Sequence, residues 1–494
     1  MKKTLKFLSM ATLILAVATL TGCSKEEEQV AEPAVVKTCT TTVSIEGNEA
    51  SKALTEAGVK TFEAGEQIAV VYENTSPTLV KEVITLTAGD ITNAGKNATI
   101  SLEMTNPKAS GTLRIIYPAA MAGTNDVDYT LLYEQNGTLD QISSQFDLGL
   151  YEGTLTGEAE LPASPELENP LTICEFTLKN EAGSGTLTGI TALYIGDGEN
   201  FYTVTPASAT NDPLWVAMKP VSSSQWITFH ATDGTHKYEK EVTGKTLTAG
   251  HMTPLGLKMN QLKEGALWGT FSVGSNDSDK VHFSQGNLKR VSGTWSFHDN
   301  QYDALGSWSS TACDLFYWET TGNYGSEENC VTSTGTSSDV VNWGVNAISN
   351  GGNVANAYST PSTDNWQYLF NSRSGYSSKY GSATVCSQHG VVILPDHWTL
   401  PTGCFFTSGM SVWSTNSYDA TAWAKMEAAG AVFLPAAGSR YGTGVNDVGL
   451  NGYYWSSTAY YGIYAWDVYF LEDNVDPGYH NRRNYGRSVR LVCE

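Results

Sequence analysis

The residues best able to do chemistry in this chain are histidines, cysteines and carboxylates, and their spacing predicts no catalytic centre. The eight histidines are scattered, with no H-E-x-x-H spacing of a zinc hydrolase and no G-x-S-x-G turn of a serine hydrolase. No C-x-x-C pair occurs, so zinc and thioredoxin-like sites lack a starting point. No pair of carboxylates stands out as a general acid and base for glycoside hydrolysis. We therefore expect neither enzymatic activity nor a cofactor.

Noncovalent recognition is the chemistry that the residue types favour, and the candidates lie near the C-terminus. Nine tyrosines fall between positions 441 and 485, too many to expose without a partner. Tyrosine gives contact area at low entropy cost, while Asn and Arg supply hydrogen bonds, as in antibody combining sites. The predicted ligand-binding residues are Tyr460, Tyr461, Tyr464, Asp467, Tyr469, Asp473, Asn474, Tyr479, His480, Asn481, Arg482, Asn484 and Tyr485.

The elements that must position these side chains are strands. Large apolar residues recur two apart within each piece of the terminal run, as in a sheet with one buried face. These predicted core residues are Trp455, Trp466, Val468, Phe470, Val489 and Leu491. The polar set is then expected on the opposite face as one recognition surface. For any single Tyr or Asn, an ordinary solvated position stays open.

A calcium site is a weaker possibility. Glu472, Asp473, Asn474 and Asp476 offer the oxygen ligands that Ca²⁺ prefers, but the Glu-Pro-Asn and Trp-Asn-Asp motifs of sugar-binding lectins are absent. Residues 125–128 and 276–279 lack the full spacing of an EF-hand loop. We expect solvated acidic loops and no metal.

Composition places the protein outside the nucleic-acid binders. The formal charge of −22 and the pI near 4.7 leave no basic stripe to displace counterions from a phosphate backbone. The 494 residues suggest about three domains at ~150 residues each. The 11% aromatic content and 47 glycines are typical of a β-rich extracellular protein with long loops.

The N-terminus predicts export and anchoring. Lys2 and Lys3 precede an apolar stretch over residues 8–20 that is too short to span a bilayer. Leu20, Gly22 and Cys23 follow in an order that resembles the bacterial lipobox. Residues 1–23 are therefore predicted to be a lipoprotein signal peptide, with Cys23 lipidated as a membrane anchor; an ordinary cleaved signal is the alternative.

Residues 24–37 are predicted to form a tether. Their acidic start, over residues 24–29, is either a solvated spacer or, by resemblance to lipoproteins of Bacteroidetes, a signal for export to the outer face of the outer membrane. Besides Cys23, seven cysteines remain, an odd number that leaves at least one thiol unpaired. Cys313 with Cys330 and Cys386 with Cys404 are the nearest candidate pairs. Cys174 is expected in the core.

The first half of the chain reads as short strands separated by turns. Examples are residues 40–45, 67–72, 81–86, 99–104, 112–117, 173–179 and 226–231. Three prolines interrupt residues 158–170, so we expect two β-sandwich subdomains over residues 38–157 and 168–259.

This region resembles the fimbrillin-like family of Bacteroidetes surface proteins. The residues that carry the resemblance are 61–70, 115–118 and the closing 246–255. Members are two-domain β-sandwich lipoproteins, many of them pilus subunits that accept a strand from a neighbour. More than 200 residues follow position 259, so the resemblance implies a tip or stand-alone role rather than shaft assembly.

Residues 266–494 differ from the first half of the chain in their sequence pattern. Two helices are predicted, near 363–371 with Trp366, Leu369 and Phe370 on one face, and near 419–429. Together with segments 281–288, 391–398 and 429–440, they resemble the C-type-lectin-like fold, and more narrowly the paralogous surface domains of Fibrobacter and Bacteroidetes. Retroelement-diversified variable proteins are similar.

The predicted fold class is thus mainly β, with two β-sandwich subdomains followed by an α+β C-type-lectin-like domain. We expect a cell-surface, lipid-anchored adhesin-like protein that binds a protein or glycan of a host, microbial or phage surface. A pilus tip or accessory subunit with pilus-subunit partners is the alternative, and an enzyme of carbohydrate uptake is a third class.

Overall fold

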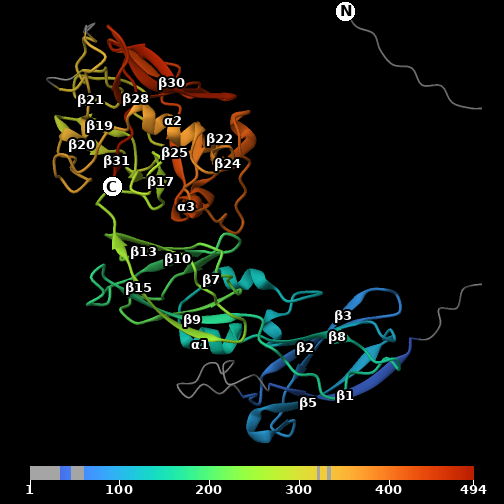
Figure 1. Ribbon diagram of the computed structural model, residues 1–494. Helices are drawn as coiled ribbons and strands as arrows, with labels where there is room; N and C mark the ends of the chain where they lie inside the picture. The colour runs from blue at the N-terminus through green and yellow to red at the C-terminus, as the bar shows by residue number, and fades with distance from the viewer. Residues whose placement is uncertain (1–33, 46–60, 320–322, 331–334) are drawn as a thin grey trace, which may run out of the picture.

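The computed structural model describes residues 34–45, 61–319, 323–330 and 335–494, and within them the chain is mainly β, as predicted (Figure 1). Cys23, the signal peptide and most of the tether lie outside the described residues. Among the described residues, no helix has the length and apolar character needed to cross a membrane.

The first body is a sandwich of two sheets. One has the order β1 (Val36–Ser44), β5 (Asn97–Thr105) and β4 (Ile91–Thr92). The short turn η1 (Asn93–Gly95) connects β4 to β5 along the chain. The other has the order β3 (Leu79–Thr85), β2 (Gln67–Glu73), β6 (Thr112–Tyr117) and β8 (Gly149–Thr154). Alternate residues of β2, namely Ile68, Val70 and Tyr72, are fully buried between the sheets.

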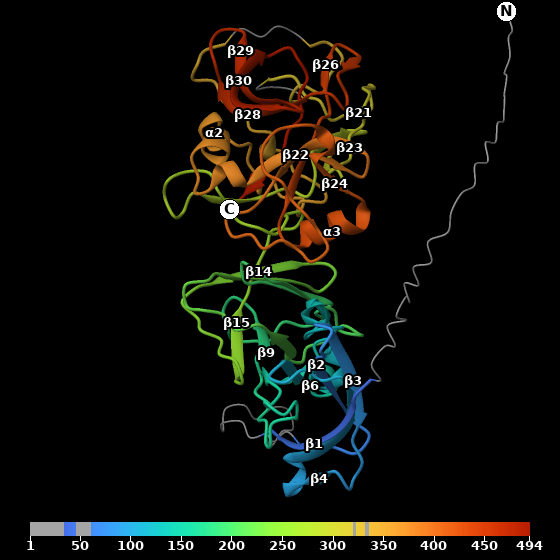
Figure 2. The ribbon, with the colours of Figure 1, turned by 90° about the vertical axis from the view of Figure 1, so that its right-hand side faces the viewer.

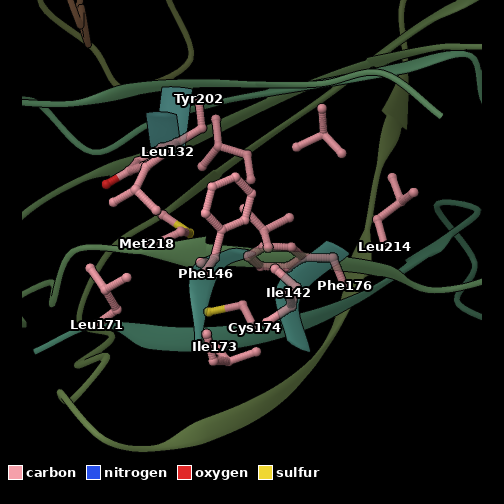
Figure 3. Packing of buried hydrophobic residues seen from close by; sticks show 14 of the residues in the cluster. Leu132, Ile142, Phe146, Leu171, Ile173, Cys174, Phe176, Tyr202, Leu214 and Met218 are labelled. Carbon is pink, nitrogen blue, oxygen red and sulfur yellow. The ribbon is translucent and has the colours of Figure 1, made fainter. Parts of the chain in front are cut away.

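The second body is another sandwich. Its six-stranded sheet has the order β16 (Asn260–Gln261), β14 (Lys237–Val242), β13 (Ile227–Thr232), β10 (Ala192–Gly196), β11 (Phe201–Val204) and β7 (Glu134–Gln135). It packs on β12 (Leu214–Met218), β9 (Thr172–Lys179) and β15 (Met252–Lys258). Cys174 and Phe176 of β9 point into this core (Figure 3), and Leu178 on the same face is also buried, as the sequence alternation predicts.

The first sandwich packs directly against the core of the second. Residues 119–148 form the short turns η2 (Ala119–Met121), η3 (Tyr129–Tyr133), α1 (Leu139–Gln141) and η4 (Ile142–Phe146), and their apolar side chains pack with the second sandwich. Strand β7 pairs in parallel with β11. Ala69 and Val71 of β2 pack against the same cluster, so β2 is buried on both faces. The predicted range 38–157 therefore contains a segment that belongs structurally to the second sandwich.

The third body holds small sheets around two helices. The sheets are β17 (Phe271–Ser272), β18 (Lys280–Phe283) and β31 (Val492–Cys493); β20 (Thr294–Phe297), β19 (Leu288–Val291) and β21 (Ala312–Cys313); β24 (Asn416–Tyr418), β22 (Tyr380–Val385), β23 (Gln388–Ile393) and β25 (Val432–Pro435); β26 (Ser439–Tyr441) and β27 (Gly444–Asn446); and β28 (Gly452–Ala459), β29 (Tyr464–Leu471) and β30 (Asn474–Arg482). Short turns η5 (Trp343–Val345), η6 (Tyr376–Ser378) and η7 (Trp413–Thr415) connect them.

Both predicted helices are present. Helix α2 (Thr363–Asn371) begins with a capping box, in which Ser362 and Asn365 each accept the other's backbone N–H, and it buries Trp366, Leu369 and Phe370. Helix α3 (Ala420–Ala428) has Asp419 as its N-cap, accepting from the Ala422 N–H at 2.8 Å. Gly430, with φ of 97°, follows its end.

The three bodies are stacked in chain order, and the sheet β28–β30 lies at the end far from the sandwiches (Figures 1 and 2). The outer face of the six-stranded sheet faces α3 and the β17 region. Here Trp268 Nε1 donates to Tyr238 O at 3.1 Å, and His230 Nδ1 donates to Ala428 O at 2.7 Å. We call this contact the junction.

The cysteines of the described residues are all free thiols, so neither candidate pair forms a disulfide. Cys313 and Cys493 are buried, and burial raises the pKa of both thiols, to about 12 and about 11. Cys174 likewise has its pKa raised to about 12 by burial, as expected of a small core residue.

Candidate ligand-binding surface

The site that the sequence predicts is the antiparallel sheet of β28, β29 and β30. The bridge Tyr454–Ser488 adds the segment beyond Arg487 to the free side of β28, which leaves β30 as the open edge. Residues opposite one another in neighbouring strands share a face of a sheet. The registers therefore assign each predicted residue to one of two faces.

One face carries a row of tyrosines. Tyr453 is opposite Tyr469, with ring centroids 5.0 Å apart, and Tyr469 lies 5.1 Å from Tyr479. The Arg487 guanidinium lies 3.7 Å from the Tyr453 ring centroid and 5.1 Å from that of Tyr485. We call the row Tyr479, Tyr469, Tyr453, Arg487, Tyr485 and Tyr441 the tyrosine ladder; its last two rings are 5.6 Å apart. Its ends are the most open, with Tyr479 40% and Tyr441 58% exposed.

A buried ion pair lies at the ladder. Arg487 Nε is 3.7 Å from Asp467 Oδ2, and Asn481 Nδ2 donates to the same oxygen at 2.8 Å. Desolvation outweighs the nearby Arg487 cation and raises the pKa of Asp467 to about 7. Arg487 has its pKa lowered, also by burial. Within the described residues, Nε and Nη1 of Arg487 have no hydrogen-bond partner.

Asp467 was predicted to contact ligand, and the structure corrects this. The carboxylate is 1% exposed, because the middle of the ladder face is covered. Trp455, opposite Asp467 in the register, is fully buried and donates from Nε1 to Phe316 O at 2.7 Å. The chain around Phe316 thus seals this part of the sheet. Asn484, at 6% exposure, is likewise too buried to be a surface contact.

The opposite face carries a second aromatic group. His480 is opposite Trp466 in the register, and Tyr460 stacks on His480 at 4.3 Å and meets Trp466 at 4.7 Å. Tyr464 lies 5.8 Å from His480. Further along this face, Val468, Phe470 and Tyr454 are buried in a cluster with Trp366 and Phe370 of α2. Trp466, predicted to be core, is only half-buried.

The predicted single surface is therefore two surfaces, back to back. Both faces of the sheet are covered over part of their length, one by α2 and one by the chain at Phe316, so large apolar residues are needed on both. Spacing within a strand defines which residues share a face, but not which face of a neighbour they join.

The remaining predicted residues lie around the open edge. Asp473, Asn474 and Arg482 are exposed at the two ends of β30, and Tyr461 is 77% exposed in the turn between β28 and β29. The side-chain amide of Asn481 already donates to the Asp467 carboxylate. No group of three or more potential metal-ligating side chains occurs in the part of the chain that the structure describes.

Three ladder members were missed from the sequence. Tyr441 and Tyr453 were counted among the tyrosines without a role, and Arg487 was not singled out. Tyr453 is two residues before Trp455 and Arg487 two before Val489, so each shares the parity of a buried residue. Alternation within a strand therefore gives no signal that these two side chains belong to a surface row.

Comparisons with known proteins cover this region and the whole chain. Residues 412–492 match a family model described as a domain of unknown function, DUF8237. A search of curated proteins found no match.

Similar solved structures include a fimbrial assembly protein from Parabacteroides distasonis, 10% identical with a TM-score of 0.26 over 51% of this chain and 97% of that one. A fimbrial protein from Bacteroides ovatus is 11% identical with a TM-score of 0.24 over 93% and 99%. Shaft pilin SpaA from Lactobacillus rhamnosus GG is 10% identical with a TM-score of 0.20 over 46% and 98%. TM-scores of this size carry no functional argument.

Proposed function

We propose that this protein is a cell-surface binding protein that captures a protein or glycan through its C-terminal body, residues 266–494. The tyrosine ladder is the observation that carries the proposal. Its rings are already held by stacking and by the Arg487 cation, so little side-chain entropy is lost when a ligand covers them.

The ladder suits a partner that offers flat or apolar patches with hydrogen-bonding groups around them. Tyrosine presents an apolar ring and a hydroxyl that can donate and accept. Exposed Asp473, Asn474 and Arg482 add polar contacts along the neighbouring edge strand β30. No step in this recognition requires a metal or cofactor.

The wider setting is part of the same proposal. We infer a lipid anchor at Cys23 in the outer membrane, with the sandwiches lifting the C-terminal body away from the surface. The two helices and short sheets support a C-type-lectin-like fold for this body. Diversification of its terminal segment by a retroelement would be consistent with a binding surface built from Tyr, Asn and Asp.

The experiment that tests the proposal compares the two faces of the sheet. Capture of array-selected protein or glycan ligands by the full chain is measured for a ladder variant, Tyr469→Ala with Tyr479→Ala, and for an opposite-face variant, Tyr460→Ala with Tyr464→Ala. The ladder variant is expected to lose at least tenfold in affinity, which is about 1.4 kcal/mol. Its melting temperature should change little, because Tyr479 is exposed and Tyr469 is partly so.

Loss of capture only in the opposite-face variant would transfer the site to the group around His480. Equal capture by both variants and the parent would refute binding by this sheet.

A structural role in a pilus is the second candidate, favoured by an open sheet edge. Strand β3 ends its sheet, and Lys81, Glu82 and Val83 on it are exposed. Such an edge can accept a strand from another subunit. Co-purification of pilus subunits, lost when Val83→Pro blocks the edge, would support this role; their absence from the purified protein would count against it.

A further inference from the structure

A cleft lies at the junction. The junction and the sheet β28–β30 are at opposite ends of the C-terminal body (Figure 2). The cleft has a volume of about 370 Å³. The second sandwich contributes Glu199, Gln225 and Trp226, and the C-terminal body contributes His397 and Trp398. Clefts between domains are a preferred location for small-molecule sites.

The two walls are fixed to one another. Trp226 stacks on His397 with ring centroids 3.9 Å apart, and His397 Nδ1 lies 3.2 Å from Glu241 Oε1. The Gly198 N–H donates to Thr399 Oγ1 at 2.8 Å. A Cβ on Gly196 would lie 2.6 Å from the same oxygen, so this close approach of the two bodies requires glycine. The cleft is therefore preformed.

Two carboxylates of the cleft are already used by the protein. Asp197 accepts the backbone N–H groups of Glu199 and Asn200 at 2.9 and 2.6 Å, which fixes the turn. Asp396 accepts from Ser272, through both its N–H and its hydroxyl. Neither is available to a ligand.

Other polar groups of the cleft are unused. Within the described residues, the indole N–H groups of Trp226 and Trp398 and the carboxylate of Glu199 have no hydrogen-bond partner. Trp226 is 39% exposed, unusual for the largest apolar side chain, and Glu199 is exposed beside it. The cleft thus combines aromatic rings with hydrogen-bond donors and an acceptor that the protein itself does not use.

We propose that this cleft binds a neutral saccharide of about two rings. The C–H face of a pyranose packs on an indole face, while its hydroxyls can accept from the indole N–H groups and donate to Glu199. An acidic sugar would be opposed by the Glu199 carboxylate. The site is composite, because Trp226 and Trp398 belong to different bodies.

The proposal does not rest on the tyrosine ladder, and its test separates the two. The full chain is titrated by calorimetry with cellobiose, lactose, maltose and mannobiose, and with digalacturonic acid as the charged probe. We expect one neutral disaccharide to bind with a Kd below about 10 mM. Trp226→Ala should weaken that binding at least tenfold, and Trp398→Phe, which keeps a ring but removes the N–H, by several-fold.

The matched control is the ladder variant Tyr469→Ala with Tyr479→Ala, which should bind the disaccharide like the parent. Far-ultraviolet circular dichroism and melting temperature show whether Trp226→Ala remains folded; Trp226→Tyr, which restores a stacking ring, should recover most of the affinity. The proposal is overturned if no neutral probe binds, if the charged probe binds most tightly, or if binding survives Trp226→Ala.

Discussion

At the scale of single residues, the least expected feature is a carboxylate buried at a tyrosine-rich surface. Asp467 is 1% exposed; its carboxylate accepts from the Asn481 amide at 2.8 Å, and Arg487 lies 3.7 Å away. Taking a charge out of water costs more than one distant cation returns, which is why the carboxyl keeps its proton at higher pH.

This residue predicts an unusual pH dependence of stability. The pKa of Asp467 rises from 3.8 in the unfolded chain to about 7 in the folded one, so between these values only the folded state holds the proton. Stability is then fully present below the unfolded pKa and is lost as the pH rises toward 7, by up to about 4 kcal/mol. Asp467→Asn should abolish that loss.

The measurement is calorimetric unfolding of the parent and Asp467→Asn between pH 4 and pH 8. The two proteins should match near pH 4, and the variant should be the more stable at pH 8. Parallel curves would mean that the carboxylate is ionised throughout and that Arg487 neutralises it fully.

At the scale of elements, Arg440 joins β26 to the chain that covers the ladder face. It is fully buried, and its guanidinium donates to the carbonyls of Leu315, Glu327, Gly442 and Gly325 at 2.8 to 2.9 Å. A lysine is a point donor and cannot reproduce this planar fork. Arg440 is thus a tie between elements rather than a ligand contact.

We expect Arg440→Lys to lower stability by about 3 kcal/mol, because at least two buried carbonyls lose their donor. For a body of this size that corresponds to a fall in melting temperature of roughly 6–12 °C. Differential scanning calorimetry measures it, with Arg482→Lys at an exposed position as the control. A shift below about 2 °C would show that water replaces the lost donors.

Sequence reasoning did well where a local rule decides the element. The spacing of Trp366, Leu369 and Phe370 predicts α2 and its buried face, and alternation places Cys174 inward on β9. It did less well where contacts with distant parts of the chain decide which sheet a strand joins or which face of a strand is buried. The short strand β7 joins the second sandwich through a parallel pairing with β11. Trp455 faces the chain near Phe316, whereas Phe470 faces α2. No periodicity within 452–471 contains that information.

At the scale of the whole molecule, the junction contains a buried histidine, His230. His230 is buried, its Nδ1 donates to Ala428 O, and desolvation lowers its pKa despite the nearby Glu239. The depressed pKa means that its contribution is present above the unfolded value near 6.5 and is lost as the pH falls. The junction should therefore weaken below about pH 6.

Limited proteolysis and small-angle scattering between pH 5 and pH 7.5 check this expectation. The parent should open at the junction in acid, and His230→Gln, which has an amide in place of the imidazole, should not follow the same pH dependence. The contribution of Asp467 to stability is lost as the pH rises, whereas that of His230 is lost as the pH falls. Comparing Asp467→Asn and His230→Gln separately with the parent therefore separates the two effects. Scattering curves that are identical at both pH values would count against a histidine-controlled junction.

The path of the chain between the two sandwiches has a consequence for how such proteins can be recombined. Residues 119–148 leave the first sandwich, complete the core of the second, and return as β8. Dividing the chain after residue 157 would therefore remove buried apolar side chains from the core of the second sandwich. The same side chains would be left exposed on the first sandwich. Exchange of domains between related proteins would have to move both sandwiches together. We therefore expect natural or engineered recombination to transfer residues 34–259 as one unit.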